Sequence, residues 1–292
     1  MEKYTVNDFN RQFPNDDVCL EWLKNYLYPD GIFCKICKKI TKHHKVASRP
    51  SYSCDYCGHH VHPTAGTIYE KSTTSLRLWF YATYLMAQTR TGISAKYLER
   101  QLGVTYKTAW RMFKQIRTLL EEDITLSGTV EVDETYVGGK DRNRHAGKKL
   151  GGTGRGAKGK AIVGGIVERK GKIIAKVIPN VQASTLLPLI DKHVLSASIV
   201  YTDEFLSYNQ VGRMGYIHKR VHHAAKVYVD GDVHTNTLEG FWSLIKRSIG
   251  GAHHAVSEKY LPSYLNEYTF RWNHRDDESP MFQSMLRQVQ KV

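Results

Sequence analysis

Three acidic residues stand where the sequence predicts the ends of strands or the start of a helix. They are Asp133 within the apolar run 130–139, Asp203 after the apolar run 199–202, and Glu239. A carboxylate in an apolar strand is unfavourable unless it is paired or binds a metal ion, although a strand edge could also expose it to water. Three such carboxylates could hold two divalent cations, because carboxylate oxygens suit hard ions such as Mg²⁺. Two ions ~3.5–4 Å apart can activate an attacking oxygen and stabilise a leaving oxygen at phosphorus.

A lysine follows the third acid by two helical turns. Lys246 lies seven residues after Glu239, so the two side chains share one face of the predicted helix and the amine could contact a phosphate. Glu134 and Glu204 adjoin the two aspartates and rank second, because neighbouring strand residues point to opposite faces. His234 could order the site or contact phosphate, but a hydrogen-bonded loop histidine explains it equally well.

Four cysteines form a second constellation. Two Cys-x-x-Cys pairs, separated by sixteen residues, comprise Cys34, Cys37, Cys54 and Cys57. Such pairs direct four thiolates at one ion, which is the closed, structural site that Zn²⁺ favours. The alternatives are two disulfides, which a reducing compartment disfavours, and a redox motif, which needs only one pair. We therefore expect one structural Zn²⁺, and we interpret the fifth cysteine, Cys19, as a small buried hydrophobe.

The charge of the chain predicts a polyanionic partner. The 292 residues include 42 Lys and Arg against 28 Asp and Glu, a formal net charge of +14. Nucleic acid is the first candidate partner and an acidic membrane surface the second. No apolar run reaches the ~18 residues of a membrane span, and the N-terminus lacks a signal-peptide core. We therefore expect a cytoplasmic protein that does not enter a membrane.

Two predicted helices precede the acidic strands. They lie on either side of Gly103, and Thr105 could cap the second helix. A helix, a glycine-containing turn and a second helix form the helix-turn-helix pattern of DNA-binding proteins, although an ordinary helical hairpin with a solvated basic face would look the same. The second helix presents basic residues opposite its apolar face, and the expected DNA contacts are Lys107, Arg111 and Lys114.

Glycine, lysine and arginine dominate residues 138–160, where Asp141 is the one acid. Such a segment cannot bury a core, so we expect a mobile loop. Its glycines formally match dinucleotide-binding and P-loop motifs, but a predicted strand follows them where those motifs require a helix. A basic arm along a phosphate backbone is the better interpretation. The candidate contacts in it are Lys148, Lys149 and Arg155.

The elements around the acids predict a mixed α/β arrangement. Apolar runs after residue 127 predict a first strand, a hairpin, a helix, and a fourth strand that pairs after a crossover. The predicted ranges are strands 130–139, 160–167, 172–178 and 199–202 and helices 76–88, 183–195, 235–247 and 257–273, with a possible strand at 216–221. Ser75 is a candidate cap for helix 76–88.

Together these features resemble a known family. Asp133, Asp203 and Glu239, with thirty-five residues between the second and third acids and Lys246 behind them, are similar to the DDE motif of transposases and retroviral-type integrases. The blocks V-D-E-T-Y-V-G-G, Y-T-D, H-T-N-T-L-E-G-F-W-S-L-I-K-R and Y-L-N-E-Y-T-F-R-W-N resemble bacterial insertion-sequence transposases with an N-terminal zinc ribbon. The resemblance extends over residues 22–273 and includes the order of ribbon, helix-turn-helix and acidic blocks.

The resemblance implies a multidomain α/β fold: an RNase-H-like mixed sheet with flanking helices, preceded by a zinc ribbon and a helix-turn-helix region. The expected domains are 1–65 (helix and ribbon), 66–125 (helix-turn-helix), 126–278 (catalytic core with loop 138–160) and 279–292 (C-terminal tail). The resemblance also implies that the three acids hold two Mg²⁺ or Mn²⁺ ions. Lys246 and the adjacent Arg247 would bind DNA. Some relatives carry Asn in place of the third acid, so Asn236 is a secondary candidate, but a carboxylate binds Mg²⁺ better than an amide.

The implied activity is cleavage of element ends followed by attack of the freed 3′-OH on target DNA. The implied partners are double-stranded DNA, as terminal inverted repeats and target, and further copies of the chain in a homodimer or higher assembly at the bacterial nucleoid. Two alternatives remain: a DNA-binding protein derived from a transposase that no longer catalyses, and a nuclease on the same core that cuts without joining.

Overall fold

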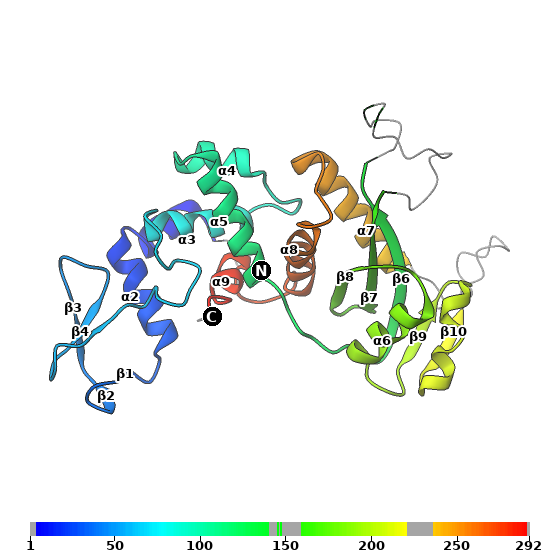
Figure 1. Ribbon diagram of the computed structural model, residues 1–292, viewed down its shortest axis with the longest axis horizontal. Coiled ribbons are helices and arrows are strands. Elements are labelled where there is room, and N and C mark those ends of the chain that lie inside the picture. Colours follow the sequence, from blue (N-terminus) through cyan, green and yellow to red (C-terminus); the bar gives the residue numbers. More distant parts are fainter. Residues whose placement is uncertain (1–3, 140–144, 146, 148–158, 221–235, 291–292) are drawn as a thin grey trace. The chain divides into compact units, whose positions relative to one another are not determined.

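The computed structural model describes residues 4–139, 145, 147, 159–220 and 236–290 (Figure 1). The chain divides into two compact units. Unit 1 comprises Met1–Leu119 with Asp276–Val292, and unit 2 comprises Leu120–Arg275. Within the described part of the chain, no helix combines the length and apolar character needed to cross a membrane.

Unit 1 is built on helices around an aromatic core. Its helices are α1 (Val6–Gln12), α2 (Asp16–Leu27), α3 (Leu76–Ala87), α4 (Ala95–Leu102), α5 (Tyr106–Leu119) and α9 (Met281–Leu286). Phe282 of α9 packs between Phe9 and Phe13 of the N-terminal segment, with ring centroids 5.7 and 6.0 Å away. Residues expected to form a C-terminal tail thus complete the core of unit 1. Cys19 is buried in α2, as predicted.

Side-chain caps fix the starts of several helices, but not that of α3. Asn15 caps α2 and Ser94 caps α4, each by accepting a hydrogen bond from a backbone N–H in the first turn. Ser75 is the N-cap residue of α3, as predicted, but its hydroxyl makes no cap hydrogen bond and instead donates to Asp16 of α2 at 2.6 Å. Ser75 therefore joins two helices of unit 1.

Short strands carry the cysteines. Strands β1 (Ile32–Cys34) and β2 (Lys39–Thr41) pair antiparallel, and β3 (His43–Lys45), β4 (Tyr52–Cys54) and β5 (His60–Val61) form a second antiparallel sheet. Each Cys-x-x-Cys pair begins at the end of a strand and continues into a turn, where the chain reverses and can direct both thiols to one side.

Helices α4 and α5 are joined by the predicted turn. Gly103 has φ +64°, a left-handed conformation that glycine adopts at little cost. The hydroxyl of Thr105 accepts a hydrogen bond from the Thr108 N–H at 3.3 Å, as expected of a cap. Helix α5 buries one stripe, consisting of Ala109, Met112, Phe113, Ile116 and Arg117.

Unit 2 contains a five-stranded mixed sheet in the order β10-β9-β6-β7-β8 (Figure 1). The strands are β6 (Thr129–Val137), β7 (Ala161–Glu168), β8 (Ile173–Ile178), β9 (Ile199–Thr202) and β10 (Ile217–Arg220). Strands β6, β7 and β8 form an antiparallel meander, while β9 pairs parallel with β6 and β10 parallel with β9. The predicted hairpin and crossover are both confirmed, and with them the mixed α/β fold class.

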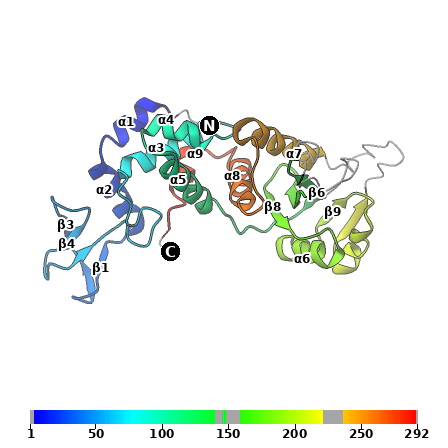
Figure 2. The ribbon, with the colours of Figure 1, turned by 45° about the horizontal axis from the view of Figure 1, so that its top comes forward.

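Helices cover both faces of this sheet (Figure 1, Figure 2). One face packs on α7 (Asn236–Ser248) and α8 (Leu261–Asn273), and the other on α6 (Ala183–His193). Val130 and Val132 belong to the core on the α6 face, so strand alternation turns the odd-numbered residues of β6 toward α7. Helix α8 begins four residues later than predicted, because Pro262 suits only the first turn of a helix.

Candidate active site

Strand β6 presents Asp133 to helix α7. The indole Nε1 of Trp242 donates a hydrogen bond to Asp133 Oδ2 at 3.0 Å. Gly165 of β7 stands beside Asp133 in register, and a Cβ added there would lie 2.5 Å from the Trp242 ring. The absence of a side chain at Gly165 therefore lets the indole lie directly on the sheet and reach the carboxylate.

Asp203 directly follows β9, the strand that pairs with β6 in parallel. Glu131 of β6 pairs with Tyr201 of β9 in parallel register, and each aspartate follows its own strand partner by two residues. Asp203 Oδ1 accepts a hydrogen bond from the Phe205 N–H at 3.0 Å, which holds the turn after β9. The parallel pairing of β6 and β9 ends two residues before each aspartate, and Asp203 is close enough to Asp133 for its charge to raise the pKa of Asp133.

The charges around Asp133 are coupled. Burial raises the pKa of Asp133 to about 7, and the negative charges of Glu134 and Asp203 act in the same direction. Desolvation of its amine lowers the pKa of Lys246, although the residue as a whole is exposed, and attraction to Asp133 opposes that effect. Asp203 and Lys246 therefore both lie close enough to Asp133 to interact with its charge.

Glu134 lies on the opposite face of β6 from Asp133, as strand alternation predicts. It accepts a hydrogen bond from the Tyr208 hydroxyl at 2.7 Å, within the core on the α6 face. Burial raises the pKa of Glu134, and the negative charge of Asp203 also raises it. Glu134 is consequently a neighbour of the candidate site that faces away from α7.

Glu239 is exposed on α7, one turn before Trp242 and two turns before Lys246. These positions share one helical face, and two of them interact with Asp133. Among the residues that the structure describes, the one set of three or more potential metal ligands within 4.8 Å is the cysteine cluster. The three carboxylates are therefore not gathered at metal-ligand distances, and Glu239 is the member that no described interaction joins to Asp133.

Sequence reasoning missed Glu131, a fully buried carboxylate two residues before Asp133. It accepts hydrogen bonds from the first turn of α7, at the Thr237 N–H (3.0 Å) and the Thr237 hydroxyl (2.8 Å). The signal was present in the sequence, because residues two apart on a strand share a face. Glu131 therefore links β6, which carries Asp133, to α7, which carries Glu239.

The four predicted cysteines meet in unit 1. Their sulfur atoms all lie within 4.8 Å of one another, and the pairs Cys34–Cys57 and Cys37–Cys54 are 3.5 and 3.9 Å apart. A hydrogen bond with Thr41 lowers the pKa of Cys54 to about 6, whereas neighbouring thiols raise that of Cys37 to about 12. Four convergent sulfurs fit a structural Zn²⁺ ion, whose charge would favour the thiolate form of all four.

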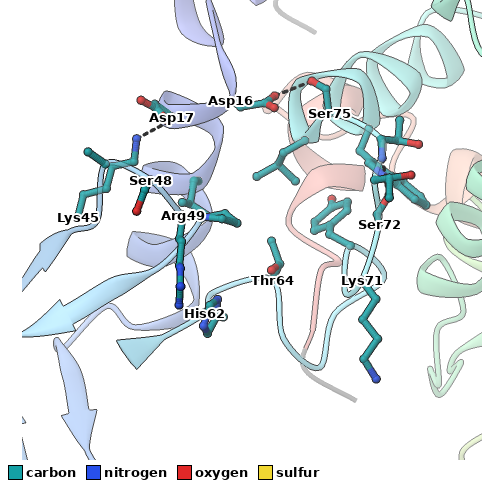
Figure 3. A pocket seen from close by; sticks show the side chains of 18 residues that line it. Asp16, Asp17, Lys45, Ser48, Arg49, His62, Thr64, Lys71, Ser72 and Ser75 are labelled. Atoms are coloured by element: carbon teal, nitrogen blue, oxygen red, sulfur yellow. Dashed lines mark hydrogen bonds and ion pairs between the residues drawn. The ribbon is translucent and has the colours of Figure 1, made fainter. Parts of the chain in front are cut away.

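Unit 1 also contains a pocket of about 560 Å³ between α2, the strand-bearing region and the segment that leads into α3 (Figure 3). Its lining includes two acids and several cations. Asp16 accepts hydrogen bonds from Ser75 and the Arg77 N–H, and Asp17 forms an ion pair with Lys45. Because both acids are already engaged by neighbouring groups, the pocket offers a poor metal site, and the candidate reaction centre remains in unit 2.

The residues predicted to bind DNA differ in their surroundings. Lys107 and Lys114 are exposed on α5. Arg111 is exposed on α5 as well; it donates to Ser72 Oγ at 3.3 Å and lies 5.8 Å from the Trp79 ring centroid. In unit 2, Asn236 and Arg247 are exposed on α7, while Lys148, Lys149, Arg155 and His234 lie outside the described residues.

Comparison with known proteins identifies the family of the chain. Residues 125–273, which contain the sheet and its acids, match the ISXO2-like transposase domain. The chain is a member of the ISXO2-like transposase family. This transposase-family chain is 31% identical over 255 residues to an uncharacterized protein in transposable element ISH50 of Halobacterium salinarum, covering 83% of this chain and 85% of the relative.

Two further similarities are more limited. An uncharacterized transposase-like protein of Haemophilus influenzae is 33% identical over 122 residues, which cover 42% of this transposase-family chain and 96% of the relative. The cryo-EM structure of the simian T-cell lymphotropic virus intasome in complex with PP2A regulatory subunit B56 gamma contains a chain with 10% identity and a TM-score of 0.31, with 65% of each chain covered. A structural likeness this low supports no conclusion about function.

Proposed function

We propose that this chain is a DNA transposase that cleaves the ends of an insertion sequence and joins them to target DNA. The proposal is carried by the parallel pairing of β6 with β9, which ends two residues before Asp133 and Asp203, together with the charge interactions of Asp133 with Asp203 and with Lys246. Membership of a transposase family supports DNA as the substrate class. The net charge of +14 suits a polyanionic partner.

The carboxylates fit divalent cations. Asp133 is half-buried, and this burial raises its pKa to about 7, with repulsion from the negative charges of Glu134 and Asp203 acting in the same direction. A divalent cation would relieve this repulsion, and carboxylate oxygens are the ligands that Mg²⁺ and Mn²⁺ prefer. Asp133 and Asp203 would hold the ions, and Glu239 would complete the set from the same helical face as Lys246. When bound, two such ions supply nucleophile activation and leaving-group stabilisation.

Both proposed reactions are displacements at phosphorus. In the first, water attacks the phosphodiester at the element end, the bond to the 3′ oxygen breaks, and that oxygen takes up a proton. In the second, the freed 3′-OH loses its proton and attacks a target phosphodiester, which releases a target 3′-OH. Lys246 would contact a non-bridging oxygen of the phosphate and hold it beside Asp133 and Asp203.

Unit 1 would supply recognition of the element ends. The cysteine-bound ion would fix the ribbon, and Lys107 and Lys114 on the exposed face of α5 would contact DNA. Arg111, which is exposed on the same helix and contacts Ser72 and Trp79, would contact DNA beside them. By analogy with the family, pairing of the two element ends suggests a homodimer or a higher assembly on DNA.

A strand-transfer assay tests the proposal. Labelled element-end DNA, plasmid target and Mg²⁺ are incubated with wild type, Asp133→Asn and Glu239→Gln. Glu121→Gln, at an exposed ion pair of unit 2 with Lys176, serves as the matched carboxylate-to-amide control. Joined product from wild type and control but from neither site variant is the expected result.

The other outcomes assign the alternatives. Nicking without joining would identify a nuclease on the same core. Binding without cleavage under Mg²⁺ or Mn²⁺ would identify a DNA-binding protein that no longer catalyses. Unchanged joining by Glu239→Gln would move the third ligand to Asn236.

A further inference from the structure

Glu131 is a carboxylate buried inside unit 2. Its side chain has 0% exposure and comes from β6, on the same face as Asp133. Its Oε2 accepts hydrogen bonds from the backbone N–H groups of Thr237 (3.0 Å) and Leu238 (3.3 Å), and its Oε1 accepts one from the Thr237 hydroxyl (2.8 Å). The N–H groups in the first turn of a helix have no partner within the helix. A negative charge there interacts favourably with the positive end of the helix dipole. Glu131 thus caps α7 from a neighbouring strand.

Arg169 balances the charge of Glu131 and extends the contact to a third element. Its Nε donates to Glu131 Oε1 at 3.1 Å, and its own exposure is 19%. The guanidinium carbon lies 4.5 Å from the ring centroid of Tyr201, within range of a cation–π interaction. Tyr201 is buried on β9, two residues before Asp203. The backbone N–H of Arg169 also donates to the Thr129 carbonyl of β6 at 2.9 Å.

The Glu131–Arg169 pair therefore touches each element that carries a candidate acid: β6 with Asp133, β9 with Asp203, and α7 with Glu239. Helix α7 is attached to β6 at two points, by Glu131 at its first turn and by the Trp242–Asp133 hydrogen bond further on. Glu239 lies between these two attachments. Lys246 lies beyond the second one, toward the other end of the helix.

We propose that Glu131 and Arg169 are positioning residues that set the position of Glu239 relative to Asp133 and Asp203 by fixing the first turn of α7 to β6 and β9. The proposal deepens the transposase function and rests on it. Loss of the Glu131 charge frees the first turn of α7, which displaces Glu239, while the Trp242 contact keeps Lys246 in place. Cleavage therefore requires more Mg²⁺ while DNA affinity is retained. A general loss of folding would impair both.

The test compares Glu131→Gln with Thr237→Val in the full-length, zinc-loaded chain. Gln removes the charge and presents an NH₂ group where an acceptor is needed. Val removes only the hydroxyl that donates to Glu131, so it leaves the buried ion pair with Arg169 intact and remains informative if Glu131→Gln does not fold. Glu121→Gln is again the control.

The first measurement is the Mg²⁺ concentration for half-maximal end cleavage, alongside the Kd for element-end DNA. For Glu131→Gln we expect a rise in that Mg²⁺ concentration of about tenfold, the usual scale when a group that orients a metal ligand is lost. We expect a rise of about threefold for Thr237→Val, partial recovery in Mn²⁺, and a Kd within about twofold of wild type for both variants. Equal losses of DNA affinity and cleavage, or unchanged Mg²⁺ dependence in Thr237→Val, would overturn the proposal.

The second measurement is hydrogen exchange in peptides that cover the start of α7, which requires no catalytic activity. The backbone amides at positions 237 and 238 should exchange faster in both variants, and exchange in β7 should be unchanged. If wild type cleaves no DNA under any divalent cation, the proposed function fails, and this exchange result still decides whether Glu131 fixes α7. Unchanged exchange at both amides would reject the positioning role whatever the activity.

Discussion

Replacing Asp133 with Asn should remove a pH dependence from the stability of unit 2. Burial and two neighbouring acids raise the pKa of Asp133 from 3.8 to about 7 in the folded protein. Between these values the folded protein holds a proton that the unfolded chain has released, so the free energy of unfolding increases as the pH falls. The contribution is fully present below pH ~4 and is lost as the pH rises through ~7.

The magnitude follows from the size of this shift. At ~1.4 kcal/mol per pH unit, the roughly two units crossed between pH 7 and pH 5 correspond to ~3 kcal/mol. Asp133 is only partly buried by surface area, so water reduces the effect, and we expect ~1–2 kcal/mol in practice. Asn cannot ionise, so Asp133→Asn should gain stability relative to wild type as the pH rises from 5 to 8.

The assay is urea unfolding followed by hydrogen exchange of β7 peptides, with zinc retained and Mg²⁺ and Mn²⁺ left out. The quantity compared is the difference in free energy of unfolding between variant and wild type at pH 5 and at pH 8. Asp123→Asn, at a largely exposed position of unit 2, is the matched control and should show no such change. If the difference for Asp133→Asn is the same at both pH values, the raised pKa of Asp133 is refuted. Added Mg²⁺ should selectively stabilise wild type at pH 8.

Three further outcomes are expected. Gly165→Ala should lower the free energy of unfolding by ~1–3 kcal/mol, because its Cβ would lie 2.5 Å from the Trp242 ring, whereas Gly164→Ala, which meets flexible aliphatic ends at 3.2 Å, should cost less in the same urea titration. Cys37→Ser should reduce zinc, measured by elemental analysis, below one ion per chain, and a full complement would reject the four-sulfur site. Lys107→Gln should reduce the slope of log K against log salt for element-end DNA by about one, and an unchanged slope would remove α5 from the DNA contact.

Local patterns in the sequence were sufficient for the elements that carry the candidate acids. The apolar run around Asp133 predicted a strand at 130–139, and β6 covers Thr129–Val137. The turn at Glu168–Gly171 predicted the hairpin of β7 and β8, which is observed. The spacing of the cysteines predicted a four-sulfur cluster, since the geometry of two Cys-x-x-Cys turns depends mainly on nearby residues.

Features that depend on distant partners could not be predicted in this way. The requirement for glycine at Gly165 comes from Trp242, and the cap on α7 comes from Glu131 on another strand. Ser75 has the residue type of a helix cap, yet Asp16 of another helix takes its hydroxyl. The gathering of Asp133, Asp203 and Glu239 into a metal site stays a prediction. Tertiary contacts decide such features, and the sequence alone does not state which partners meet.

The two segments that make unit 1 have a consequence for synthesis. Unit 2 lies between them in the chain, so the ribosome completes residues 120–275 before it adds α9. Phe282 is therefore added after all of unit 2, and until then Phe9 and Phe13 lack one of the rings that cover them. A nascent chain would carry the complete five-stranded sheet of unit 2 while unit 1 still exposes aromatic surface to chaperones. A premature stop after residue 275 would therefore damage unit 1, which loses α9, and spare unit 2, which ends at that residue.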